Sequence, residues 1–208
     1  MSSNVALRRT RRLGERRQAM GQGRRLEVIE SDVGALARRA AQAPIRLCLL
    51  QADLEGSALK GGVASVVLAR GRASDAITAA VFLIDTYCFG IKHVFIQEMT
   101  LEGLAKLAFE MSNVAQVTKV APAYARKLLR DAAAWAAAIG FKPHRDFAAI
   151  EQVFGDVEVD AAAAFTFGLN GKPFYAPEPT ETRVQARQRF AHLLTRLGEG
   201  GFDYMRED

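Results

Sequence analysis

The stretch ITAAVFLIDTY, residues 77–87, is apolar on both of the faces that an extended strand presents. Alternate residues of a strand point to opposite sides, and here the two sets are Ile77, Val81 and Leu83 on one face and Ala80, Phe82 and Ile84 on the other. A strand that is apolar on both faces belongs in the interior of a sheet, with another layer covering each side. The sequence therefore predicts a central strand covered by helices.

The segments around this strand predict the rest of its sheet. Short runs rich in β-branched residues, separated by Gly, Ser and Asp, are typical of an antiparallel meander. Such runs occur at IRLCLLQ (45–51), GVASVVLAR (62–70) and, after a bend at Gly90, IKHVFI (91–96). We expect three to four antiparallel strands.

Helices are expected on both sides of this meander. Helical spacing of apolar residues predicts a helix from Leu26 to about Ala41. Further helices are expected over 100–113, where Thr100 can cap the first turn, over 122–140, where Pro122 suits the first position, and over 144–155.

The C-terminal part predicts a β-hairpin and a last helix. In FTFGLNGKPFYAP (165–177), Asn170-Gly171 favours a type I′ turn, and Pro173 places the second arm at an edge. The last helix is expected from Thr180 to Gly198. The fold class is thus α+β, an antiparallel meander covered by helices with a C-terminal hairpin and helix, in a single domain over 26–208.

Residues 1–25 form a strongly basic arm ahead of this domain. The whole chain of 208 residues has 28 Lys and Arg against 23 Asp and Glu, a net charge of +5. Residues 1–25 contain eight arginines and one glutamate, or +7, so residues 26–208 carry 20 basic and 22 acidic residues, or −2. The basic character therefore belongs to the arm, which we expect to be disordered.

Arginine forks match phosphate geometry, so the arm predicts association with the backbone of RNA or DNA. The residues expected to bind are Arg8, Arg9, Arg11, Arg12, Arg16, Arg17, Arg24 and Arg25. Sparse apolar residues and three glycines argue against membrane binding by the arm. The alternatives are a solvated leader without function, an organellar transit peptide, or a true start at Met20.

Asp85 is the candidate catalytic residue, because it interrupts the most apolar strand of the chain. A carboxylate there must lie at the rim of the sheet, be paired, or have a shifted pKa. Lys92 and His93 follow the bend and are its expected partners, and an ion pair or a turn cap is the structural interpretation.

A catalytic interpretation of the same residue predicts a metal-dependent hydrolase or nuclease. Asp85, Asp53 and a glutamate such as Glu102 would hold a divalent metal, with His93 beside them. The early strands with an Asp loosely resemble ribonuclease-H-like nucleases, although three successive helices without a strand depart from that pattern. No other cofactor is expected.

The remaining motifs give weaker evidence for a function. HRD (144–146) resembles a kinase catalytic loop, but Glu151 stands where that loop has Asn. The spacing of the three histidines does not by itself define a metal site. Cys48 and Cys88 lie in apolar runs and are expected to be buried. No apolar run is long enough to cross a membrane, so a cytoplasmic protein is expected.

Three segments, FLIDTYCFGIK (82–92), AAIGFKPHRDF (137–147) and FGLNGKPFY (167–175), resemble those of a set of uncharacterised bacterial proteins over residues 45–205. The resemblance implies no activity, and it suggests that the body is one unit to which the arm is added. Most aromatic residues of the chain are expected in the core, and only Phe174 and Tyr175, on a predicted edge strand beside Lys172, are candidates for exposed contacts. A further alternative is a protein-interaction module whose partner, not identified by the sequence, binds the acidic tail GFDYMRED (201–208).

Overall fold

The computed structural model describes residues 33–55, 58–72, 76–177 and 181–205, with the side chains of 53–61 excepted. Four strands follow one another as a meander, and each pairs antiparallel with the next. They are β1 (Ile45–Glu55), β2 (Ala58–Gly71), β3 (Ile77–Asp85) and β4 (Gly90–Met99). The predicted α+β class is confirmed, and each strand except β3 extends beyond its predicted range.

A fifth strand, β5 (Val117–Lys119), completes the sheet in the order β4-β3-β2-β1-β5. It pairs antiparallel with β1 between Leu49 and Gln51. The sequence did not predict it, because three residues are too few to show an alternation of apolar and polar positions. It separates two helices that were expected to follow one another without a strand.

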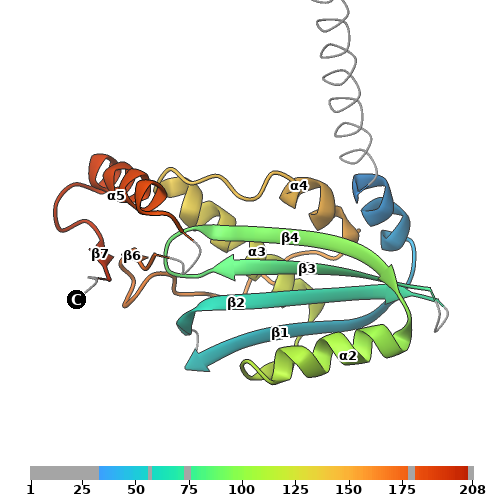
Figure 1. Ribbon diagram of the computed structural model, residues 1–208. Coiled ribbons are helices and arrows are strands. Elements are labelled where there is room, and N and C mark those ends of the chain that lie inside the picture. The colour runs from blue at the N-terminus through green and yellow to red at the C-terminus, as the bar shows by residue number, and fades with distance from the viewer. Residues whose placement is uncertain (1–32, 56–57, 73–75, 178–180, 206–208) are drawn as a thin grey trace, which may run out of the picture.

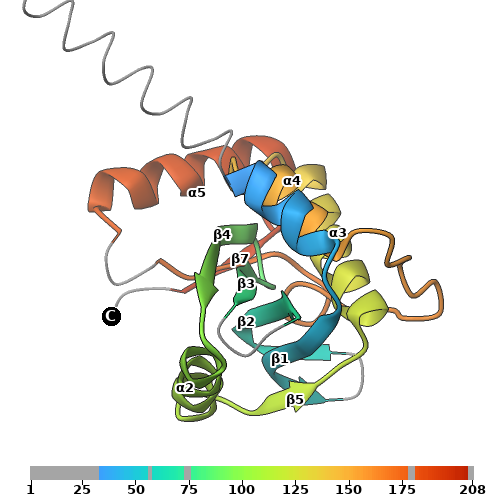
Figure 2. The same ribbon diagram turned by 90° about the vertical axis from the view of Figure 1, so that its right-hand side faces the viewer.

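Helices cover both faces of the sheet (Figures 1 and 2). On one face lies α2 (Leu101–Ser112), whose first turn Thr100 caps by accepting a hydrogen bond from the Gly103 amide at 3.1 Å. On the other lie a helical stretch at 33–41, α3 (Pro122–Ala138), α4 (Phe147–Ile150) and the 3₁₀ turn η1 (Glu151–Phe154). None of the described helices is long and apolar enough to cross a bilayer.

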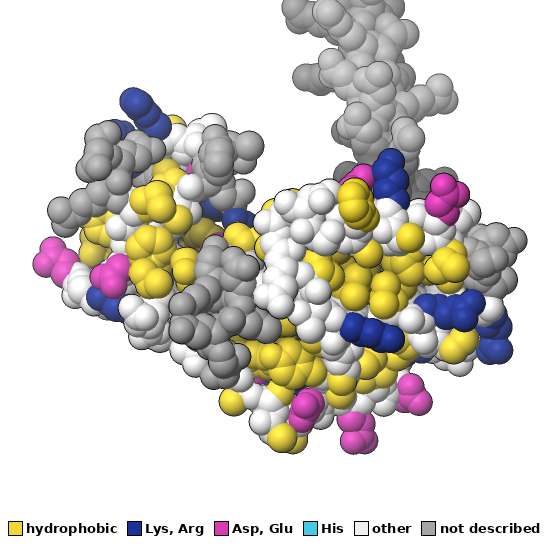
Figure 3. Space-filling view, turned by 90° about the horizontal axis from the view of Figure 1, so that it is seen from below, with side chains coloured by type: hydrophobic (Ala, Val, Ile, Leu, Met, Phe, Trp, Pro, Cys, Tyr) yellow, Lys and Arg dark blue, Asp and Glu magenta, His cyan; other side chains and the backbone are white. Residues whose placement is uncertain are grey.

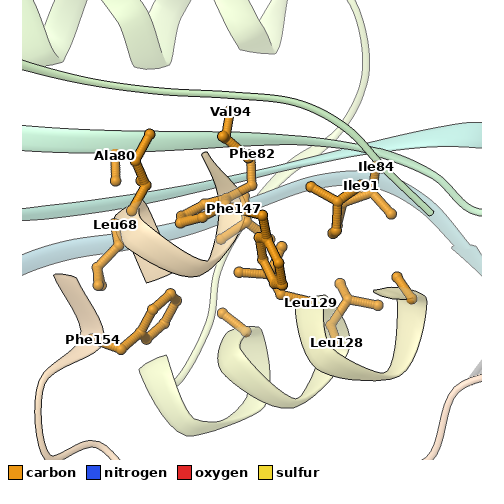
Figure 4. Packing of buried hydrophobic residues seen from close by; sticks show 14 of the residues in the cluster. Leu68, Ala80, Phe82, Ile84, Ile91, Val94, Leu128, Leu129, Phe147 and Phe154 are labelled. Carbon is orange, nitrogen blue, oxygen red and sulfur yellow. The ribbon is translucent and has the colours of Figure 1, made fainter. Parts of the chain in front are cut away.

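The strand β3 is buried on both faces, as its sequence predicts. Ile77, Ala79 and Val81 pack in the cluster under α2, together with Leu104. Ala80, Phe82 and Ile84 pack in the larger cluster under α3 and α4. Figure 4 shows Phe82 within this cluster, where its ring centroid lies 6.2 Å from that of Phe147 and 6.0 Å from that of Phe154.

The C-terminal segment forms a third, smaller cluster at the end of the sheet where β3 turns into β4 (Figure 1). It contains α5 (Arg183–Leu197), β6 (Phe174–Tyr175) and β7 (Asp203–Tyr204). Thr182 and Gln185 cap α5 reciprocally, and Gly198 follows its last residue. The buried members are Cys88, Phe89, Ile139, Tyr175, Leu193 and Phe202.

The predicted hairpin is present only at its turn. Asn170 and Gly171 have φ values of 56° and 81°, as a type I′ turn requires, and Leu169 bridges Lys172. Beyond Pro173, which has no N–H to donate, β6 pairs instead with β7 in parallel. Tyr175 is therefore 3% exposed, and the expectation that it is an exposed contact is wrong.

Both cysteines are free and buried, as expected. Burial raises the pKa of the Cys48 and Cys88 thiols to about 12. Neither thiol therefore has the thiolate character that nucleophilic or redox chemistry requires.

A largely buried ion pair fixes the segment after η1 on α3. Glu151 accepts hydrogen bonds from Arg126 Nε at 2.6 Å and from Arg130 Nε at 3.0 Å. Arg126 also donates to the carbonyls of Gly155 and Val157. Burial raises the pKa of Glu151, but the hydrogen bonds from the two arginines outweigh it, and the net pKa lies below the ordinary value.

We expect Glu151→Gln to lower the free energy of unfolding by about 1–3 kcal/mol at neutral pH, because it removes a charge-assisted acceptor. A lowered native pKa gives stability that is present above the unfolded pKa of about 4.3 and is lost as pH falls through the native pKa. The difference between wild type and variant in urea unfolding should therefore disappear in acid.

The matched control is Glu110→Gln on α2, whose pair with Lys106 is exposed and 3.9 Å long. It should change the unfolding free energy by less than about 0.5 kcal/mol. Equal losses in the two variants would contradict a special role for the Arg126–Glu151 pair.

Candidate functional site

A cleft of about 420 Å³ opens at the end of the sheet where β3 turns into β4. Its walls come from the start of β4, the loop 140–146 between α3 and α4, and α5. Figure 3 shows a different feature, the hydrophobic side chains that gather on the face of the molecule seen from below. The lining residues are Leu83, Phe89, Ile91, Lys92, His93, Phe141, Lys142, His144 and Arg189.

Backbone contacts hold the loop 140–146 against the sheet. The His144 amide donates to the Ile91 carbonyl at 2.9 Å, and the Phe141 amide donates to the Ala136 carbonyl at 2.9 Å. Gly140 has a φ of +92°, and a Cβ there would lie 2.7 Å from His192 Nε2. Glycine is thus required where the loop passes α5.

Two cations form the inner wall of the cleft around one aromatic ring. The Arg189 guanidinium lies 4.7 Å from the centroid of Phe89, and Lys92 Nζ lies 5.8 Å from it. Each cation has a carboxylate partner: Arg189 Nη1 is 3.1 Å from Glu181 Oε1, and Lys92 Nζ is 3.9 Å from Asp85 Oδ2. Cation–π contacts and ion pairs together fix both positive groups.

Two imidazoles stand on the outer side of the cleft. The rings of His93 and His144 are perpendicular, with centroids 5.2 Å apart. His144 Nδ1 accepts a hydrogen bond from the Asp146 amide at 3.3 Å. The neutral His144 ring therefore carries its proton on Nε2, because an accepting nitrogen cannot also hold a proton. That leaves an N–H donor available for a ligand.

Asp85 acts as a cap for the turn between β3 and β4. Its Oδ1 accepts hydrogen bonds from the amides of Tyr87 at 2.9 Å and Cys88 at 2.8 Å. Burial raises the pKa of the Asp85 carboxyl, against the opposing effects of these amides and of Lys92. The expected pair with Lys92 is present, whereas His93 contacts His144 and Phe95. Asp85 lies behind Lys92 and does not line the cleft.

The structure does not bring together the carboxylates expected to hold a metal. Met99, which precedes the helix that carries Glu102, pairs with Ile77 at the opposite end of β3 from Asp85, roughly 26 Å away along the strand. Asp53 lies two strands from Asp85 and pairs with Lys60, whereas Asp85 pairs with Val63, so their backbones are roughly 14 Å apart. The expected arrangement is therefore wrong.

Among the side chains that the structure describes, no group of three or more His, Cys, Asp or Glu residues could hold a metal ion. The side chain of Asp53 and the eight arginines of the arm, Arg8 to Arg25, lie outside the described residues.

Sequence reasoning missed Phe141, Lys142, His144 and Arg189 as site residues. The segment FKPHRDF (141–147) has three basic or imidazole side chains in seven residues, and this was the available signal. Nothing in the local pattern shows that this loop contacts β4 and α5, because each of those elements lies about 50 residues away from it in the sequence.

Comparisons with protein-family models, curated protein sequences and solved structures returned no match.

A pair of substitutions at Asp85 tests its role as a turn cap. Asn keeps the acceptor oxygen for the two amides, whereas Ala removes it, so Asp85→Ala should unfold about 1–3 kcal/mol more easily than Asp85→Asn. The raised pKa gives wild type stability that is full below the unfolded pKa of about 3.9 and is lost as pH rises through the native pKa.

The Asn variant has no carboxyl to ionise, so its unfolding free energy relative to wild type should rise as the pH increases from the unfolded pKa through the raised native pKa. Urea unfolding at several pH values measures this. If Asn and Ala destabilise the protein equally at neutral pH, the ionised carboxylate itself stabilises the turn and the interpretation fails.

Proposed function

We propose that this protein is a non-enzymatic module that associates with RNA or DNA, through its arginine-rich arm and through the basic cleft. The observation that carries the proposal is a cleft lined by Lys92, Lys142, Arg189 and two imidazoles, with no carboxylate among its lining residues. Positive groups converging in a concave site attract anions and exclude cations. Aromatic rings beside them suit the planar bases of nucleic acids.

The arm supports the same function by a different mechanism. Its net charge of +7 in 25 residues gives attraction to phosphates without sequence readout. The rest of the chain is slightly acidic, at −2, so long-range attraction to nucleic acid depends on the arm.

A metal-dependent hydrolase centred on Asp85 has weaker support. That carboxylate is occupied by two turn amides and Lys92, and the other two expected ligands lie on distant elements. A protein-interaction function is favoured by no specific contact of the described residues.

The arm is tested in the full chain by replacing all eight arginines with glutamine, and in a matched control with lysine. Binding of a fluorescent single-stranded RNA and of a DNA duplex is measured by anisotropy across a salt series. Wild type should lose about 10³-fold or more in duplex affinity between roughly 50 and 200 mM salt. The log–log salt slope of the glutamine variant should be shallower by up to about 7, since each neutralised phosphate contributes about 0.9.

The lysine variant keeps the charge and should retain most of the slope. The proposal is overturned if wild type binds neither nucleic acid at low salt, or if the glutamine variant binds as wild type does. Strong preference for one sequence would also contradict it, because backbone contacts position without specifying.

A further inference from the structure

We propose that the cleft between β4, the loop 140–146 and α5 is a binding site for a single nucleotide that carries a phosphate monoester, with the phosphate among the cations and the base against Phe141. This rests on the proposed nucleic-acid association and names the ligand of its cleft. The bound nucleotide is either the phosphorylated 5′ end of a strand or a free nucleotide, and both present a phosphate monoester next to a base.

The cleft offers three cationic side chains to a phosphate monoester, and two of them, Lys92 and Arg189, are already paired with carboxylates behind them. Lys92, Lys142 and Arg189 come from three separate elements and line one hollow. A phosphate monoester carries about −1.5 to −2 at neutral pH and offers three acceptor oxygens. Lys and Arg donors reaching it from different directions neutralise that charge over several oxygens at once.

The ion pairs at the back of the cleft place their positive ends toward the ligand. Glu181 is 3% exposed while its partner Arg189 is 37% exposed, and Asp85 is 13% exposed while Lys92 is 19% exposed. The carboxylates are thus the more buried member of each pair. Each holds its cation in place from behind, which reduces the side-chain ordering that ligand binding must impose.

The outer part of the cleft supplies an imidazole donor and an apolar surface. His144 keeps Nε2–H as a donor because its Nδ1 accepts the Asp146 amide. The ring of Phe141 is held perpendicular to that of Phe89, with centroids 4.8 Å apart. Phe141 also packs against His192, with centroids 4.8 Å apart, and it is only partly buried, so we assign the base to the part of its ring that lines the cleft.

The shape of the cleft favours a protruding nucleotide over a continuous duplex. A volume of about 420 Å³ at a concave site suits one small-molecule unit, whereas a duplex presents a convex backbone. A second hollow, beside Arg70, does not offer the same chemistry. There the guanidinium is occupied by the carbonyls of Ala41, Ala43 and Phe154, and Asp156 lines the hollow.

The experiment follows the imidazole signals of the full chain by NMR. The chain has three histidines, of which His93 and His144 line the cleft, so assignment by single substitution is direct. Adenosine 5′-monophosphate should shift both signals in a saturable way. Adenosine, which lacks the phosphate, should bind at least about tenfold more weakly, because it forfeits the charge-assisted hydrogen bonds.

Lys142 offers the cleanest substitution, because its side chain is exposed and its replacement leaves both buried ion pairs intact. Lys142→Gln should weaken binding of the monophosphate about three- to tenfold, and Lys142→Arg should restore it. Lys119→Gln, on the exposed strand β5, is the matched control and should bind as wild type does.

Equal affinity for adenosine and its monophosphate, or an unchanged affinity in Lys142→Gln, overturns the proposal. Competition distinguishes the two sources of the phosphate. If the cleft binds strand ends, a 5′-phosphorylated RNA displaces the monophosphate, whereas a 5′-hydroxyl RNA of the same sequence does not. Competition by neither RNA assigns the site to the free nucleotide.

Failure here is separable from failure of the proposed function. The chain with eight glutamines in the arm should bind the monophosphate as wild type does. If the full chain binds long RNA with a salt dependence but does not bind the monophosphate, the arm accounts for nucleic-acid binding and the proposed nucleotide site in the cleft is rejected.

Discussion

The structure depends on the burial of β3 between two layers of helices. Phe82 faces α4 and η1 on one side of the sheet, and Val81 faces the layer of α2 on the other. A strand enclosed in this way has a fixed register, because a slip by one residue would exchange the differently sized side chains that pack against its two layers. The turn that follows is thereby fixed, and with it the inner wall of the cleft.

The end of β3 shows how a stability constraint also positions charge. Asp85 ends the apolar run and accepts the two amides of the next turn, which a buried turn would otherwise leave unsatisfied. Gly90 then starts β4 with a φ of +64°, where a Cβ would lie 2.6 Å from the Ala132 carbonyl of α3. This close approach of strand and helix fixes the start of β4, the stretch of strand that carries Lys92 and His93.

The sequence was sufficient for features that local patterns encode, and insufficient for features that depend on distant contacts. Apolar periodicity predicted the meander and the buried strand, and Thr100 and Pro122 predicted where two helices begin. The short strand β5 and the pairing of β6 with β7 have too few residues to leave a pattern. The sequence singled out Asp85 and His93 as catalytic candidates, and the structure places His93 in the wall of the cleft and Asp85 behind it, near Arg189 and His144, which only folding brings close.

The arm and the cleft have complementary physical roles in the proposed function. A chain whose body carries −2 repels a polyanion at long range, and a single concave cluster of cations cannot reverse that over many ångströms, because salt screens fields within about 8 Å. The arm, with a net charge of +7 in 25 residues, supplies the charge that raises the local concentration of phosphate near the body. In this proposal the cleft acts at contact distance, where its cations discriminate by geometry. Attraction and recognition are thus separated along the chain, and each can be removed without removing the other.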